Sequence, residues 1–171
     1  MGILITNNRR LDLENWLIHN GTFPEWLPPA LIGTEIIYIF HCENNGSIDS
    51  IRAGATTLLI PSNGHSIRVG SQQGGVIAAM KDEFNNGPKI AGRPVLIEQI
   101  KYIRFITPTS IPGTYTLLQK KGKIKNVIWP WVEANFTIVN TSARDWIPFR
   151  TGKGDPININ SFIDSIDPTS L

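Results

Sequence analysis

One stretch of this chain limits its possible folds more than any other. It runs from Ser71 to Phe84 and reads SQQGGVIAAMKDEF. The glycine pair is typical of a turn that begins a helix, and every residue from Val76 to Met80 is apolar. A helix on the surface of a domain has a polar side, so a helix without one is predicted to be buried. The rest of the chain must therefore supply enough apolar surface to enclose it.

Two carboxylates follow the apolar residues of this stretch. Asp82 and Glu83 lie about two helical turns after the glycine pair, at 3.6 residues per turn. Carboxylates at the end of a buried helix need either partners or a chemical role. Two interpretations stay open from the residues alone. The pair is either an active-site acid or an ordinary charged helix end, screened by Lys81.

The segments around this helix are predicted to be strands. Two precede it and three follow it, at residues 31–42, 48–60, 94–106, 115–121 and 125–139. The first two are rich in β-branched residues, and the Asn44-Asn45-Gly46 turn joins them as a hairpin. The last shows period-two alternation, with one face made of Ile128, Val132, Ala134, Phe136 and Ile138. Because the connections are short and turn-like, the sheet is predicted to be mostly antiparallel.

The two ends of the chain are predicted to lie outside this arrangement. Residues 1–32 form an N-terminal arm with a short helix, and residues 141–171 form a polar C-terminal tail. That tail is expected to dock onto the body through Trp146, Ile147 and Phe149, and residues 161–166 favour one helical turn. No second domain or internal repeat is visible, so residues 33–140 are interpreted as one domain.

Composition excludes several classes of function. The chain has 171 residues and a net charge of +2, too small to indicate nucleic-acid binding. Cys42 is the only cysteine, and the three histidines are not spaced as in zinc sites, so neither a metal nor a cofactor is predicted. No signal peptide or membrane span is visible. We therefore expect a soluble cytoplasmic protein without a membrane partner.

The order of elements predicts an α+β fold. A helix that is apolar on all sides cannot lie on a flat sheet with its back to water, so the sheet curls around it or a second subunit covers it. A single domain in which a curled antiparallel sheet of five or more strands wraps a central buried helix is the hotdog architecture.

The stretch from Gln73 to Glu83 resembles the helix entry of the hotdog acyl-CoA thioesterases. Their pattern is commonly His-Gly-Gly, six mostly apolar residues and then an acid. Asp82 stands at the place of that acid, whereas Gln73 stands at the place of the histidine. Residues 100–114 also resemble the family, in which a long strand ends in a proline and a Pro-Gly turn begins the next strand. The resemblance implies hydrolysis of an acyl thioester of coenzyme A or of a carrier protein, by a homodimer or a larger homo-oligomer.

The chemistry of such a site can be assigned residue by residue. The backbone N–H groups of Gly74 and Gly75 at a helix start can stabilise the oxyanion of a thioester under attack. Gln73 can add an amide donor. By resemblance, Asp82 is the general base or nucleophile, and Glu83 is the alternate. From the residues alone, a Gly-Gly pair is also common where a loop joins a helix.

Three further residues are candidates for substrate binding. His65 lies in a Gly-His loop that resembles the hotdog 3-hydroxyacyl dehydratases, but the position five residues after Gly75 is Met80, which cannot carry out acid–base chemistry. An exposed loop histidine is the alternative. Lys121 and Lys123 are predicted at a basic hairpin tip that either holds phosphates or blunts a sheet edge. A non-catalytic hotdog protein that binds an acyl or other apolar ligand is the alternative function.

Overall fold

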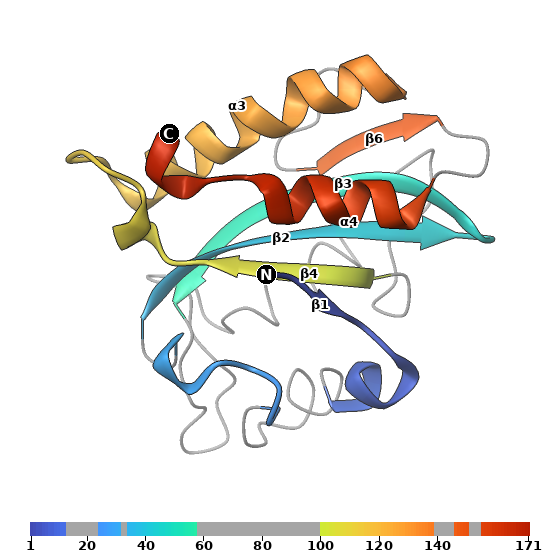
Figure 1. The fold of residues 1–171 in the computed structure, drawn as a ribbon, viewed down its shortest axis with the longest axis horizontal. Helices are drawn as coiled ribbons and strands as arrows, with labels where there is room; N and C mark the ends of the chain where they lie inside the picture. Colours follow the sequence, from blue (N-terminus) through green and yellow to red (C-terminus); the bar gives the residue numbers. More distant parts are fainter. Residues whose placement is uncertain (13–23, 32–33, 58–99, 139–145, 151–154) are drawn as a thin grey trace.

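The computed structural model describes residues 1–12, 24–31, 34–57, 100–138, 146–150 and 155–171 (Figure 1). In this part of the chain the fold is α+β, with a six-stranded sheet in the order β1-β4-β2-β3-β6-β5. Every pair of neighbouring strands is antiparallel. The strands are β1 (Ile3–Leu4), β2 (Glu35–Asn44), β3 (Ser47–Thr57), β4 (Ile100–Ile106), β5 (Thr137–Ile138) and β6 (Trp146–Arg150). The predicted antiparallel sheet is therefore confirmed.

Two helices lie on the sheet in Figure 1, α3 (Leu117–Asn135) and α4 (Pro156–Ser165). Residues 7–12 are also helical. Short 3₁₀ turns complete the described elements, at η1 (Pro29–Leu31), η3 (Pro108–Ser110) and η4 (Pro168–Ser170). Of the helices in these ranges, none is both long enough and apolar enough to cross a membrane.

The β2–β3 hairpin is the longest pairing in the sheet and confirms the first two predicted strands. Its register ends at the pair Asn44 and Ser47, so the loop consists of Asn45 and Gly46. Both loop residues have positive φ, 52° and 77°. A two-residue hairpin loop with positive φ at both positions matches the right-handed twist of the strands, and Asn-Gly is the favoured sequence for it.

The strand β4 lies on the other side of β2, where Ile37 pairs with Ile106 and His41 with Tyr102. It confirms the described part of the predicted strand 94–106. Because β2 is antiparallel to both β3 and β4, these two outer strands run parallel to each other. The chain therefore leaves β3 at one end of the sheet and enters β4 at the opposite end.

The predicted strands at residues 115–121 and 125–139 are wrong. This region is the helix α3, and only Thr137–Ile138 at its end forms a short strand. A capping box begins the helix: the Thr116 side chain accepts from the backbone N–H of Gln119, and the Gln119 side chain accepts from the backbone N–H of Thr116. Its buried residues, Ile124, Ile128 and Val132, are spaced by four, which places them on one helical face.

The C-terminal segment contributes more to the fold than the predicted tail would. Within it, β6 pairs with β3 and β5, and Ile147 and Phe149 are buried, which confirms their docking. The helix α4 has 10 residues instead of a single turn. Its start is explained by Asp155, whose side chain accepts from the N–H of Ile157, followed by a proline at the first helical position.

The two faces of the sheet are both buried along β2. On the face that carries α3 and α4, Ile37 and Ile39 join one core with Ile128 and Ile163. On the opposite face the side chains of β2 are also at most 1% exposed; they are Ile36, Tyr38, Phe40 and Cys42. A sheet buried on both faces gives β2 a continuous apolar sequence instead of a strict alternation.

Candidate functional site

The residues predicted to carry catalysis lie outside the described part of the chain. All of them fall between Thr57, where β3 ends, and Ile100, where β4 begins. They are His65, Gln73, Gly74, Gly75, Asp82 and Glu83. The predicted central helix and its oxyanion hole therefore stay predictions.

Lys121 and Lys123 lie on α3 and not at a hairpin tip, so the proposal that they blunt a sheet edge is wrong. The Lys123 ammonium lies 4.3 Å from the centre of the Tyr115 ring, a distance typical of a cation–π contact. Their neighbour Lys120 donates to the carbonyl oxygen of Pro108 at 2.8 Å, which ties the start of α3 to η3. Phosphate binding by Lys121 and Lys123 stays a prediction.

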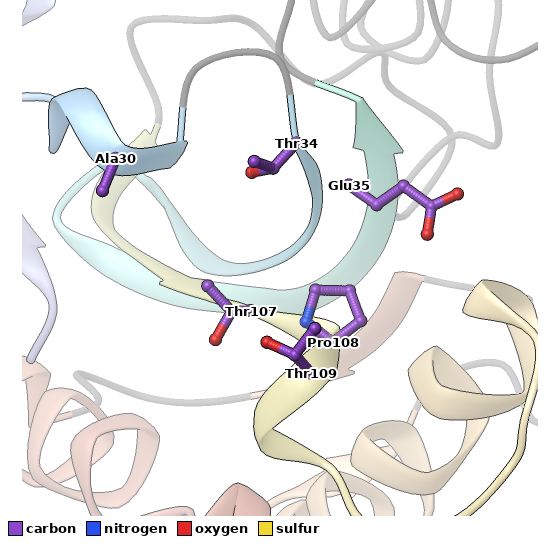
Figure 2. A pocket seen from close by; sticks show the side chains of 6 residues that line it. All are labelled: Ala30, Thr34, Glu35, Thr107, Pro108 and Thr109. Carbon is purple, nitrogen blue, oxygen red and sulfur yellow. The ribbon is translucent and has the colours of Figure 1, made fainter.

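A cavity of about 350 Å³ lies where η1, the start of β2 and the end of β4 meet (Figure 2). The described residues that line it are Ala30, Thr34, Glu35, Thr107, Pro108 and Thr109. The Thr34 hydroxyl donates to the carbonyl oxygen of Leu31 at 2.6 Å, so it can offer only lone pairs to a ligand. The cavity thus presents hydroxyl groups and one carboxylate.

This cavity has the size of a small-molecule binding site. Its volume is at the lower end of the range for small-molecule sites, about 300–1,000 Å³. Covalent catalysis needs a nucleophile within hydrogen-bond reach of a base. The described lining offers threonines and Glu35 but no histidine, cysteine or lysine. Its outer residues Ala30, Thr34, Glu35 and Thr109 are exposed, so a ligand there would stay in contact with water.

A second candidate is a cluster of side chains between the sheet and α4. We call it the polar layer; it consists of His41, Tyr102, Arg104, Asn160 and Asp164. The His41 Nε2 atom lies 2.8 Å from the Asn160 Oδ1 atom, and because an amide oxygen only accepts, Nε2 is the donor. The Tyr102 hydroxyl donates to the Asp164 carboxylate at 2.5 Å.

Backbone groups complete these contacts. The N–H of Gly2 donates to the Asp164 carboxylate at 2.6 Å, so the N-terminal segment also reaches α4. Arg104 Nη1 donates to the carbonyl oxygens of Ile163 at 2.5 Å and Ile166 at 2.9 Å. The last carbonyls of a helix have no partner within the helix. Arg104 therefore satisfies two such groups and places a positive charge at the negative end of the helix dipole.

Burial determines the protonation of this layer. It lowers the pKa of His41 to about 4, and the positive charge of Lys101 contributes, while the hydrogen bond to Asn160 opposes the shift. Burial also raises the pKa of the Tyr102 phenol, and the hydrogen bond to Asp164 and the charge of that residue add to the effect. At neutral pH, the His41 imidazole is uncharged and the Tyr102 hydroxyl keeps its proton.

The polar layer attaches α4 to the sheet. His41 is 0% exposed, so no substrate can touch it while α4 is attached. Sequence reasoning missed the layer. Its one sequence signal is a histidine in line with Ile37 and Ile39 on a predicted strand, whereas Asn160 lies 119 residues further along the chain.

Comparison with family models, with curated proteins and with solved structures finds no match to this chain. Within the described residues, no group of three or more histidine, cysteine, aspartate or glutamate side chains is placed to hold a metal ion. The choice between functions therefore depends on the sequence pattern and on the geometry given above.

Proposed function

We propose that this protein hydrolyses an acyl thioester of coenzyme A or of a carrier protein, on a hotdog-like domain. One observation carries the proposal. The segment from Gln73 to Asp82 combines a helix-starting glycine pair with a carboxylate at the spacing of the hotdog thioesterases. A glycine pair supplies donors for an oxyanion, and the carboxylate activates water or attacks the thioester carbon.

The topology of the described strands supports a crossing helix at this point of the chain. The parallel strands β3 and β4 flank β2, and 42 residues separate the end of one from the start of the other. Parallel strands need a crossover connection of a dozen or more residues, and it is usually helical. The buried face of β2 opposite α3 and α4 offers Tyr38 and Phe40 as an apolar surface for it.

The mechanism follows from these roles. The Gly74 and Gly75 amides and the Gln73 side chain bind the thioester carbonyl oxygen. Asp82 takes a proton from water as the water attacks the carbonyl carbon. The tetrahedral intermediate then collapses to the carboxylic acid, the bond to sulfur breaks, and the proton held by Asp82 passes to the leaving sulfur, which departs as the thiol. Glu83 is the alternate base. The proposal includes a homodimer or larger homo-oligomer in the cytoplasm, and light scattering tests the oligomeric state.

The deciding experiment compares Asp82→Asn with the wild-type protein on acyl-CoA thioesters of graded chain length, following thiol release. We expect kcat to fall by about 10²–10⁴-fold, because general-base catalysis contributes that much. Asp12→Asn, on an exposed aspartate at the end of helical residues 7–12, is the matched control and keeps full activity. Equal turnover by Asp82→Asn and wild type removes Asp82 from the mechanism.

A non-catalytic binding protein is the second candidate, and Gln73 in the place of the histidine favours it. The element order of the thioesterases has strands where this chain has Leu117–Asn135, so that half of the resemblance is lost. Gln73 in place of the histidine fits a site that binds without cleaving. Native mass spectrometry of the purified protein separates the two functions: an acyl or other apolar ligand that stays bound, without turnover on any thioester, identifies the binder.

A further inference from the structure

The polar layer holds α4 with contacts that depend on a neutral histidine. His41 uses Nε2 to donate to Asn160, and its other nitrogen, Nδ1, is buried without a hydrogen-bond partner. A proton on Nδ1 would create a buried charge and a buried N–H without an acceptor. The buried charge and the N–H without an acceptor each cost free energy. A histidine that is exposed to water does not incur these costs.

The charges that face His41 do not offset this cost. On β4, the positive charge of Lys101 opposes a positive charge on His41. On β3, the residue opposite His41 is the uncharged Ile51. The carboxylate of the polar layer is Asp164 on α4, which contacts Tyr102 and not the imidazole. Asp164 already accepts hydrogen bonds from the Tyr102 hydroxyl and the Gly2 amide.

The attachment of α4 is also separable from the sheet. The helix makes no ladder hydrogen bonds with a strand. Its polar contacts to the sheet are made by the Asn160 and Asp164 side chains, one turn apart, and by the carbonyl oxygens of Ile163 and Ile166, which accept from Arg104. The β2–β3 hairpin has its own backbone pairing from Glu35 to Asn44, with one shift of register between Cys42 and Glu43. No strand pairing of the sheet involves a residue of α4, so release of the helix would expose the imidazole to water without breaking a backbone hydrogen bond of the hairpin.

We propose that the polar layer makes the attachment of α4 sensitive to acid: protonation of His41 releases α4 from the sheet while the β2–β3 hairpin stays folded. The direction follows from proton linkage. The released state has an ordinary histidine, with a pKa of 6.5, and the attached state has a pKa of about 4. The attachment is therefore fully present above pH 6.5 and is lost as the pH falls from 6.5 toward 4.

Hydrogen–deuterium exchange of the full-length protein tests this proposal, with labelling times corrected for the intrinsic pH dependence of exchange. The peptides to compare cover residues 156–165 and residues 35–57. Because the histidine pKa is about 4 in the attached state and 6.5 in the released state, the opening equilibrium of α4 should rise roughly twentyfold between pH 7 and pH 5. We expect that increase in the α4 peptide and no change in the hairpin peptide. Equal loss of protection in both peptides means global unfolding and overturns the proposal.

Two variants separate the role of His41 from that of the Asp164 carboxylate. In His41→Gln the side-chain amide can still donate to Asn160 but does not titrate, so α4 is expected to stay protected at pH 5. In Asp164→Asn the amide oxygen can still accept from Gly2 and Tyr102, and acid release is expected to persist. Release that survives in His41→Gln, or disappears in Asp164→Asn, contradicts the proposal.

An NMR titration of the wild-type imidazole keeps the test independent of variant folding. The ring carbons of His41 report its protonation directly. We expect the chemical shift to stay at its neutral value down to about pH 5 while α4 is attached, because the pKa is about 4. An imidazole that titrates near pH 6.5 in the attached state overturns the proposal.

Discussion

The helices α3 and α4 pack on the same face of the sheet but are held there in different ways. The longer helix α3 contacts the core through Ile124, Ile128 and Val132, all 0% exposed. The shorter helix α4 contributes Ile159 and Ile163 to the same core and adds the polar layer. Apolar burial is non-directional and independent of protonation, whereas hydrogen bonds require a defined orientation and charge state. One core can therefore hold one helix, α3, by contacts that do not depend on pH and another, α4, by contacts that do.

The largest expected effect comes from truncating one buried isoleucine in each helix, Ile128→Ala in α3 and Ile163→Ala in α4. Each change leaves a cavity where the wild-type residue is 0% exposed, and such losses cost about 2–5 kcal/mol. Urea unfolding at pH 7 measures the free energy for both variants. We expect similar costs, because the two side chains share one core.

The free-energy costs of Ile128→Ala and Ile163→Ala are expected to differ when the same variants are measured at pH 5. If the higher opening equilibrium at pH 5 lets α4 detach before the sheet unfolds, Ile163→Ala should lose part of its cost and Ile128→Ala should keep it. Costs that stay equal at pH 5 would show that both helices respond to acid in the same way. Val127→Ala, at the exposed surface of α3, is the control and should change the free energy only slightly.

The hairpin and α3 also show what sequence patterns can and cannot decide. The β2–β3 hairpin follows from local chemistry, because the two loop positions need positive φ and the sequence has Asn45 and Gly46 there. For α3, the apolar pair Ile128 and Val132 is spaced by four, which fits one face of a strand and one face of a helix equally. The period-two alternation over residues 125–139 favoured the strand interpretation, which was wrong; the helix even contains Pro130.

A signal for the helix was nevertheless present in the sequence. Thr116 followed by Gln119 is a capping box, and the structure contains both of its hydrogen bonds. The candidate site was less predictable. Tyr102 and Asp164 are 62 residues apart, and no local pattern pairs them. The residues of the proposed thioesterase site come from a local pattern, and their arrangement lies outside the described residues.

A smaller effect is expected from Arg104→Met, which removes a polar attachment specific to α4. Methionine keeps an apolar stem of similar length but cannot donate to the carbonyl oxygens of Ile163 and Ile166. Hydrogen bonds from a charged donor contribute about 1.5–3 kcal/mol, so urea unfolding should show a loss of that size. Arg104→Lys, which keeps the charge and a donor, should lose less. Equal losses in the two variants would assign the effect to packing.

The smallest expected effect has the opposite sign and concerns α3 alone. Gly122 lies inside this helix, and a methyl group added there would meet no atom within 4 Å. Replacing a helix-interior glycine by alanine reduces the entropy of the unfolded chain, so Gly122→Ala should stabilise the protein by about 0.5–1 kcal/mol. Gly46→Ala is the matched control, since its φ of 77° is unfavourable for alanine and the change should destabilise the hairpin. A melting temperature that rises for Gly122→Ala and falls for Gly46→Ala would show that helix propensity limits the stability of α3. The stability of the attachment of α4, in contrast, depends on the protonation of the polar layer. A melting temperature that falls for both variants would mean that α3 needs Gly122 for close packing. The attachment of α3 would then require a defined geometry, as the attachment of α4 does.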